Sequence, residues 1–382
     1  MSSELSEAVR DICDTISKRI ERSYVFECGR KKERPDDLWQ MWADTGLLGV
    51  GVPEEYGGLG GGITEVVLAH DLLHQHGLIM PETITSHMVR HPLLHFGTEE
   101  QKQRYIPPTV TGEEFFSFAV TEADAGTNTF KNKTKAVRQD NGNFLLNGEK
   151  IYITGFLESD HCLVVARTGE PDKSSRTSGM SLFIVDPDWK GISATEMDIG
   201  HYVPDRNYIV HFDDVEVPAE NILGPEGEAL KILFSSLNSE RVLSAGMAIG
   251  LADHSLNRGV EYAKVRAPFD QPIGAYQSIQ HPMALAKAHI EAARCLMYAA
   301  CAKMDAGESA GLESNMVKLL ASEAFKEAID ITTFAYGGAT MDLSSDLIPF
   351  YLLAKHMTVA PVNNAIVKSF IAQQALGLPR SY

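Results

Sequence analysis

The stretch Phe118-Ala119-Val120-Thr121-Glu122-Ala123-Asp124-Ala125-Gly126-Thr127-Asn128 is where the sequence changes character. Its first residues continue an aromatic and apolar run that begins at Phe116 and is typical of a short strand. Small and polar residues then take over, which is typical of a loop. Such a segment offers backbone N–H groups and hydroxyls to a polar ligand. A plain exit from a strand into a loop explains the local pattern equally well.

The sequence on either side of this stretch has a different texture. Before it, apolar residues such as Leu5, Val9 and Ile16 recur at helical spacing within residues 3–110. After it, short β-branched segments and an Asn141-Gly142 hairpin signal continue to about residue 220 and favour a compact β-barrel or sandwich. Helix formers then dominate residues 228–264, 276–306 and 311–336, as in a helical bundle. We therefore predict an N-terminal α-helical domain (1–115), a middle β-domain (116–226) and a C-terminal α-helical bundle domain (227–382).

Composition excludes several classes of function. The 382 residues carry 34 basic and 51 acidic side chains, so the formal charge is −17, which disfavours binding to nucleic acid. No apolar run approaches the roughly 20 residues that span a bilayer, and the N-terminus lacks the features of a signal peptide. We expect a cytoplasmic protein. Its five cysteines are scattered and form no CxxC pair, which argues against a disulfide framework and a thiolate zinc site.

Two other patterns have ordinary explanations. Histidines recur at near-helical spacing in two groups: His70, His74 and His76, and His87, His91 and His95. Without an HExxH motif, and with Pro92 interrupting the second group, they are expected to be packing or surface residues, and no metal site is predicted. The glycines in residues 57–62 lack the strand–turn–helix context of a nucleotide-binding loop and are expected to form a turn.

Residues 118–128 resemble the TEPxAGSD signature of acyl-CoA dehydrogenases, with Ala123 in place of Pro and Thr127-Asn128 in place of Ser-Asp. Further matches follow in family order: PEEYGG at 52–58, GTEEQK at 96–102, NGxKxWIT at 147–154, FDDVxVP at 212–218 and RxxFGxxxxxxQ at 266–277, where Asp270 replaces Gly. The ordered set covers nearly the whole chain. On these motifs the chain is identified as a member of that family.

The resemblance implies an N-terminal α-helical domain, a middle β-barrel domain and a C-terminal four-helix bundle. It implies a flavoprotein oxidoreductase of lipid or fatty-acid metabolism that binds FAD and an acyl-CoA thioester and forms a trans-2-enoyl-CoA. An electron-transfer flavoprotein would reoxidise the cofactor. The family is usually a homotetramer built as a dimer of dimers, and heterotetramers also occur.

The resemblance also implies positions for the cofactor. Phe118, Val120 and Thr121 should line the flavin ring, Tyr152 should stack on it, and Thr154 should lie near its reactive nitrogen. Gly126 and Thr127 should lie near phosphate or substrate groups. Arg266 and Gln277 match positions that reach the FAD of a neighbouring subunit, and Phe269, Gly337 and Gly338 also match cofactor-binding positions.

The catalytic base has two possible places in the family. The usual place is a C-terminal loop, which here covers residues 357–364, holds no carboxylate and has Pro361 where the Glu is expected. Isovaleryl- and long-chain-type members instead carry the base on a C-terminal helix, just before an Arg, as in Leu237-Asn238-Ser239-Glu240-Arg241. We therefore predict Glu240 as the base, with Asn238 and Arg241 near the CoA moiety. An apolar pocket would raise its pKa toward neutrality.

Departures from the family pattern leave two alternatives open. Pro361 has no backbone N–H to donate to a thioester carbonyl, so a neighbouring residue must supply the donor. Phe334 replaces a usual Gln, and the RDAK motif is Leu352-Leu353-Ala354-Lys355 here. The chain could therefore be a partner subunit that contributes part of an FAD site in a heteromeric enzyme. It could also be a flavin oxidase or monooxygenase of the same fold.

Overall fold

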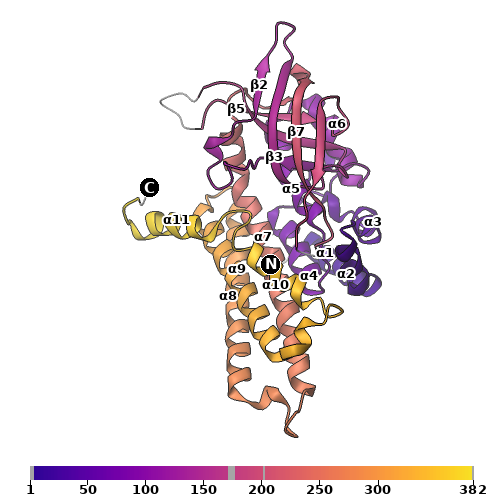
Figure 1. Cartoon of the computed structure of the whole chain (residues 1–382), viewed down its shortest axis with the longest axis vertical. Coiled ribbons are helices and arrows are strands. Elements are labelled where there is room, and N and C mark those ends of the chain that lie inside the picture. Colours follow the sequence, from indigo (N-terminus) through magenta and orange to yellow (C-terminus); the bar gives the residue numbers. More distant parts are fainter. Residues whose placement is uncertain (1–3, 171–176, 201–202, 381–382) are drawn as a thin grey trace.

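The computed structural model describes residues 4–170, 177–200 and 203–380, which form a helical, a β and a second helical part in chain order (Figure 1). The first part contains α1 (Glu4–Arg19), α2 (Arg22–Lys31), α3 (Asp36–Asp44), α4 (Ile63–Gln75), α5 (Pro81–Phe96) and α6 (Glu99–Thr111). The GTEEQK motif starts α6 with a capping box. Thr98 Oγ1 accepts from the Gln101 N–H (3.2 Å), and Gln101 Oε1 accepts from the Thr98 N–H (3.1 Å).

The middle part is one eight-stranded mixed sheet with the order β6-β7-β3-β2-β4-β5-β8, and β1 pairs with β4 in parallel. Its strands are β1 (Phe116–Ala119), β2 (Lys135–Arg138), β3 (Phe144–Thr154), β4 (His161–Arg167), β5 (Met180–Val185), β6 (Ile192–Glu196), β7 (Asn207–Val217) and β8 (Ile222–Leu223). One face has its own core, which includes Phe144 and Phe183. A second core joins β1, β4 and β5 to α5, α6 and the start of α7.

The last part contains α7 (Ala229–Val265), α8 (Gln277–Asp305), α9 (Gly311–Tyr336), α10 (Leu347–His356) and α11 (Asn364–Leu376). Figure 1 shows α7, α8 and α9 running side by side away from the sheet, while α11 projects sideways. One hydrophobic core unites this bundle with the N-terminal helices, so the two helical parts are packed as one body. The predicted α–β–α fold is confirmed. Within the described ranges, no helix combines the length and apolarity needed to cross a membrane.

Helix α7 is in close contact with α4 because it carries glycine where the two backbones meet. A Cβ atom on Gly250 would lie 2.5 Å from the backbone oxygen of Asp71, and one on Gly246 would lie 3.3 Å from that of Val67. The two glycines are four residues apart, so they occupy the same face of α7. Their missing side chains set the distance between the two helices.

We predict that Gly250→Ala destabilises the protein by about 1–3 kcal/mol, because the new methyl group meets backbone that cannot move aside. Chemical unfolding of the full chain measures the change. Gly311→Ala in α9 is the matched control, since its Cβ would find no atom nearer than 3.8 Å. That control should be neutral, or stabilising by up to about 1 kcal/mol through helix propensity. Equal stability of the parent and the Gly250 variant would contradict the packing argument.

Candidate functional site

The loop after β1 is held by a buried ion pair between Glu122 and Lys150, which lie in two of the motifs that resemble the family. Lys150 Nζ in β3 lies 2.9 Å from Glu122 Oε1 and donates to the Val120 carbonyl at 3.1 Å. The Glu122 carboxylate also accepts from the backbone N–H groups of Lys133 (2.6 Å) and Thr134 (2.9 Å). With these partners satisfied, the pair can remain buried. It fixes the backbone on both sides of Thr121.

Two adjoining cavities lie where this loop, β3, α5, α7 and the segment after α10 meet. The larger has a volume of about 470 Å³ and the smaller about 180 Å³. The larger is lined by six predicted cofactor residues and the predicted base: Phe118, Val120, Thr121, Gly126, Tyr152, Thr154 and Glu240. The smaller cavity shares Thr154 and Glu240 with it but has mainly apolar walls, which include Ile84, Met88, Met247, Leu353 and Met357.

The sheet side of the larger cavity presents an aromatic ring and a hydroxyl. The register of β3 against β7 shifts between Lys150 and Ile153, and Tyr152 within this bulge has φ 58°. A non-glycine residue with positive φ is uncommon, and Tyr152 is also 57% exposed. Thr154 ends β3 and turns its hydroxyl to Asn207 Oδ1 at 3.1 Å. An exposed aromatic face and hydroxyls on a fixed backbone fit a planar ring with polar edges, such as the flavin of FAD.

Glu240 lies on α7 and lines both cavities. Its side chain is partly buried, and burial raises the pKa of its carboxyl to about 7, although the Arg241 guanidinium opposes this rise. Arg241 Nη1 donates to Asn238 Oδ1 at 3.1 Å. Among the described residues, neither Asn238 nor Arg241 contributes to the lining of the two cavities. The site thus contains a carboxyl group that is poised to exchange a proton near neutral pH.

Other predicted residues lie elsewhere. Thr127 is exposed in the loop next to Gly126. Five further predicted cofactor residues, two of them predicted to reach a neighbouring subunit, gather at the end of α7, the start of α8 and the end of α9, which Figure 1 shows at the far end of the bundle from the sheet. They are Arg266, Phe269, Gln277, Gly337 and Gly338, and all are exposed in the single chain, Phe269 by 79%. One chain therefore does not bring them to its own cavity.

The sequence analysis missed several residues of the cavity walls. Asp205 lines both cavities, as do Thr85 and His356, and Asn207 lines the larger one. Asp205 precedes β7 as a single acidic residue, and His356 ends α10, so neither stands in a recognisable motif. Pro361 and Ala360 of the C-terminal loop line both cavities, and no carboxylate of residues 357–364 is available there.

The histidines that the sequence analysis tested for metal binding pack against one another. The rings of His70 and His74 lie 5.6 Å apart, those of His91 and His95 lie 4.2 Å apart, and burial lowers the pKa of His74 to about 4. In the part of the chain that the structure describes, no group of three or more His, Cys, Asp or Glu side chains is arranged to hold a metal ion.

Comparisons with protein families match all three parts of the chain. Residues 2–113 match the N-terminal domain of acyl-CoA dehydrogenases, residues 117–215 the middle domain and residues 230–376 the C-terminal domain. The acyl-CoA dehydrogenase FadE12 of Mycobacterium tuberculosis is 33% identical over 385 aligned residues, which cover 100% of this chain and 98% of that protein.

Solved structures agree with these matches. Butyryl-CoA dehydrogenase from Megasphaera elsdenii superimposes with a TM-score of 0.91 at 28% identity, over 98% of both chains. A chain in a structure described as the electron transferring flavoprotein of Acidaminococcus fermentans does so with a TM-score of 0.90 at 29% identity, again over 98% of both chains. With its three domains matched and its cavities lined as described, the chain belongs to the acyl-CoA dehydrogenase family of FAD-dependent oxidoreductases that act on CH–CH bonds.

Proposed function

We propose that this chain converts an acyl-CoA thioester to the trans-2-enoyl-CoA, with Glu240 as the base that removes the α-proton. Bound FAD supplies the acceptor for the hydride that leaves the β-carbon. Phe118, Val120, Thr121 and Tyr152 would hold the flavin ring from the sheet side. The acyl chain would occupy the apolar smaller cavity, which excludes water from the reacting carbons.

The observation that carries this proposal is the position of Glu240. Its carboxyl lies at the junction of the two cavities, and Thr154 of the sheet lines the same junction. A thioester α-proton is a weak acid, so its base must be close to the substrate and be a strong base when ionised. A pKa of about 7 meets the demand for base strength, because near neutral pH much of the carboxyl is ionised and the carboxylate is more basic than that of an ordinary Glu.

The C-terminal loop supports this choice of base by exclusion. Ala360 and Pro361 line both cavities and have no acidic group to offer. Asp205 is the other carboxyl that lines both cavities. It lies just before β7 of the sheet, and its carboxylate accepts a hydrogen bond from Asn207. Glu240 comes from helix α7, whereas the residues proposed to hold the flavin come from β1, the loop after it and β3. The base and the hydride acceptor can thus act on the substrate from different elements.

We also propose an oligomer in which the far end of the bundle completes the FAD site of another chain. The exposure of Arg266, Phe269 and Gln277 supports this, since an Arg fork suits a pyrophosphate and an exposed Phe suits burial against a partner. We further propose that an electron transferring flavoprotein accepts the electrons from the reduced FAD of this chain. The similarity to a chain in a structure of such a flavoprotein supports this.

We predict that Glu240→Gln binds acyl-CoA but reduces bound FAD about a hundredfold to ten-thousandfold more slowly, which is the usual contribution of a general base. Anaerobic mixing with a panel of acyl-CoAs, followed by loss of flavin absorbance, measures the rate. Glu261→Gln is the matched control, because Glu261 lies on the same helix, is exposed and pairs with Lys264 at 2.6 Å. It should behave like the parent.

Three outcomes would count against this assignment. Normal bleaching by Glu240→Gln would show that another group removes the proton, and loss of bleaching in Asp205→Asn alone would identify that group as Asp205. A parent chain that remains colourless after FAD loading would favour the partner-subunit alternative. A parent that forms product only while consuming oxygen would favour the oxidase alternative.

We predict that the rate of flavin reduction rises with pH through about 7 and then levels off. The base acts only as a carboxylate, and burial raises the pKa of Glu240 to about 7, so protonation below that pH removes the active form. Single-turnover rates across neutral pH measure this step. Asp205→Asn should keep the step, because the titrating group is Glu240. A rate that is flat through neutrality would contradict the prediction.

A further inference from the structure

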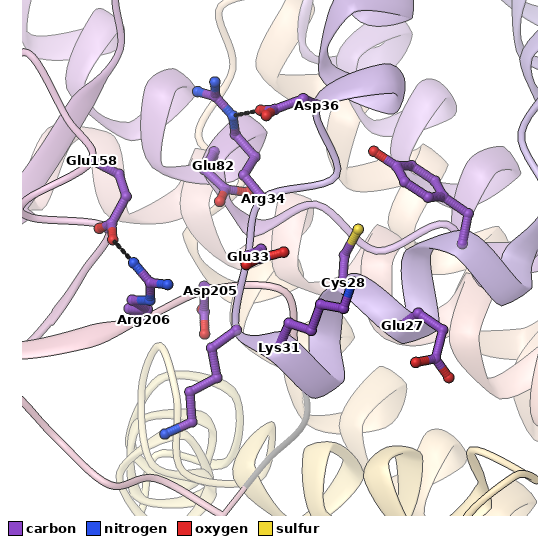
Figure 2. A pocket seen from close by; sticks show the side chains of 13 residues that line it. Glu27, Cys28, Lys31, Glu33, Arg34, Asp36, Glu82, Glu158, Asp205 and Arg206 are labelled. Atoms are coloured by element: carbon purple, nitrogen blue, oxygen red, sulfur yellow. Dashed lines mark hydrogen bonds and ion pairs between the residues drawn. The ribbon is translucent and has the colours of Figure 1, made fainter.

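A third cavity, of about 440 Å³, lies beside the site and is lined mostly by charged residues (Figure 2). It opens between the α2–α3 region and the middle domain. Its walls carry both basic and acidic side chains, which are Lys31, Lys32, Arg34, Arg206, Glu27, Glu33, Asp36, Glu82, Glu158 and Asp205. Among the residues that the structure describes, Asp205 alone lines this cavity and both cavities of the site. Its carboxylate therefore stands at the boundary between the polar cavity and the proposed flavin site.

A hydrogen-bonded chain leads from Asp205 back to the sheet edge of the site. Asn207 Nδ2 donates to Asp205 Oδ1 in a long hydrogen bond of 3.4 Å, and Thr154 Oγ1 donates to Asn207 Oδ1 at 3.1 Å. Thr154 and Asn207 are partners in the register of β3 and β7, and Asn207 is buried. The two strands thus hold the three side chains in sequence.

The charge on Asp205 determines which atoms donate and which accept in this series of hydrogen bonds. An ionised carboxylate only accepts hydrogen bonds, so it orients the Asn207 amide with Nδ2 toward Asp205 and Oδ1 toward Thr154. The Thr154 hydroxyl has one hydrogen, and it donates this hydrogen in its hydrogen bond to Asn207 Oδ1. The lone pairs of Thr154 Oγ1 are then left to accept a hydrogen bond from whatever occupies the larger cavity.

The surroundings of Asp205 shift its ionisation to about neutral pH. Burial and the nearby Glu158 raise its pKa to about 7, while Lys32 opposes the rise. Glu158 is itself bound by Arg206 at 3.1 Å and by the Tyr208 hydroxyl at 2.6 Å. Figure 2 shows Glu82 on the same cavity, and burial raises the pKa of this second acid to about 8. Asp205 therefore carries its charge above neutral pH.

We propose that Asn207 and Asp205 are positioning residues that make Thr154 a hydrogen-bond acceptor toward bound FAD. This inference rests on the proposed function and on the motif match that implies the reactive flavin nitrogen near Thr154. That nitrogen accepts a hydrogen bond when the flavin is oxidised and donates one, as N–H, when it is reduced by two electrons. An accepting Thr154 favours the reduced cofactor, so the relay raises the reduction potential of bound FAD.

The test compares the midpoint potential of FAD in purified holoproteins, titrated by absorbance against a reference dye above neutral pH. Asn207→Ala should lower the potential, because the freed Thr154 hydroxyl can then donate to the oxidised ring. A roughly tenfold shift toward the oxidised form corresponds to about 30 mV for a two-electron couple. Asp205→Asn should shift the potential in the same direction, because a neutral side chain no longer orients the amide.

The chain offers a matched pair of controls on the same two strands. Asn147 Nδ2 donates to Asp214 Oδ1 at 3.0 Å at an exposed position of β3 and β7. Asn147→Ala and Asp214→Asn should therefore keep the parent potential. If Asn207→Ala fails to fold, Asp205→Asn alone decides the test.

Each result has a defined meaning. A lower potential in the Asn207 or Asp205 variant, with unchanged controls, supports the relay. An unchanged or raised potential in these variants overturns the relay but leaves the proposed dehydrogenation intact, since acyl-CoA would still reduce the parent enzyme. A parent chain that retains no FAD overturns both the relay and the proposed function.

Discussion

The contact of α4 with α7 at Gly246 and Gly250 is the constraint on which the geometry of the site depends. Glu240 lies six residues before Gly246 on the same helix, about 9 Å along the axis at 1.5 Å per residue. The N-terminal part that contains α4 continues into α5, which supplies Thr85 and Met88 to the cavity walls. The spacing of the two helices therefore sets the distance between the proposed base and the apolar pocket that it faces. A side chain at either glycine would separate parts of one site.

The sequence could predict the parts of the site that are built by local motifs. Glu122 and Lys150 lie 28 residues apart, yet their ion pair and the backbone bonds of Glu122 explain why both motifs contain them. Thr98 and Gln101 likewise form the capping box that the GTEEQK pattern indicates. In these places the motif residues determine the backbone conformation directly, so the pattern in the sequence and the structure report the same physical cause.

The sequence could not predict the parts of the site that arise only from convergence in space. Asp205 is an ordinary acidic residue before a strand until the fold brings it to the junction of three cavities. Asn207 acquires its meaning from its register partner Thr154, which is 53 residues away. For Arg266 the motif match implies a role in a neighbouring subunit, and its exposure in the single chain agrees with that, but one chain does not contain the partner surface that Arg266 would contact.

In this acidic chain, Arg241 is the nearby cation that lowers the pKa of Glu240. The protein carries a formal charge of −17, and burial alone would push the pKa of Glu240 upward until the base was protonated at neutral pH. Arg241 opposes that rise from the adjacent position on α7, where its guanidinium is held by Asn238. A cation held in this way lowers the pKa of the base without entering the substrate cavity. If CoA binds as proposed, a guanidinium that turned outward to it, as the motif match implies, would leave Glu240 with a higher pKa, and its carboxyl would be ionised less often.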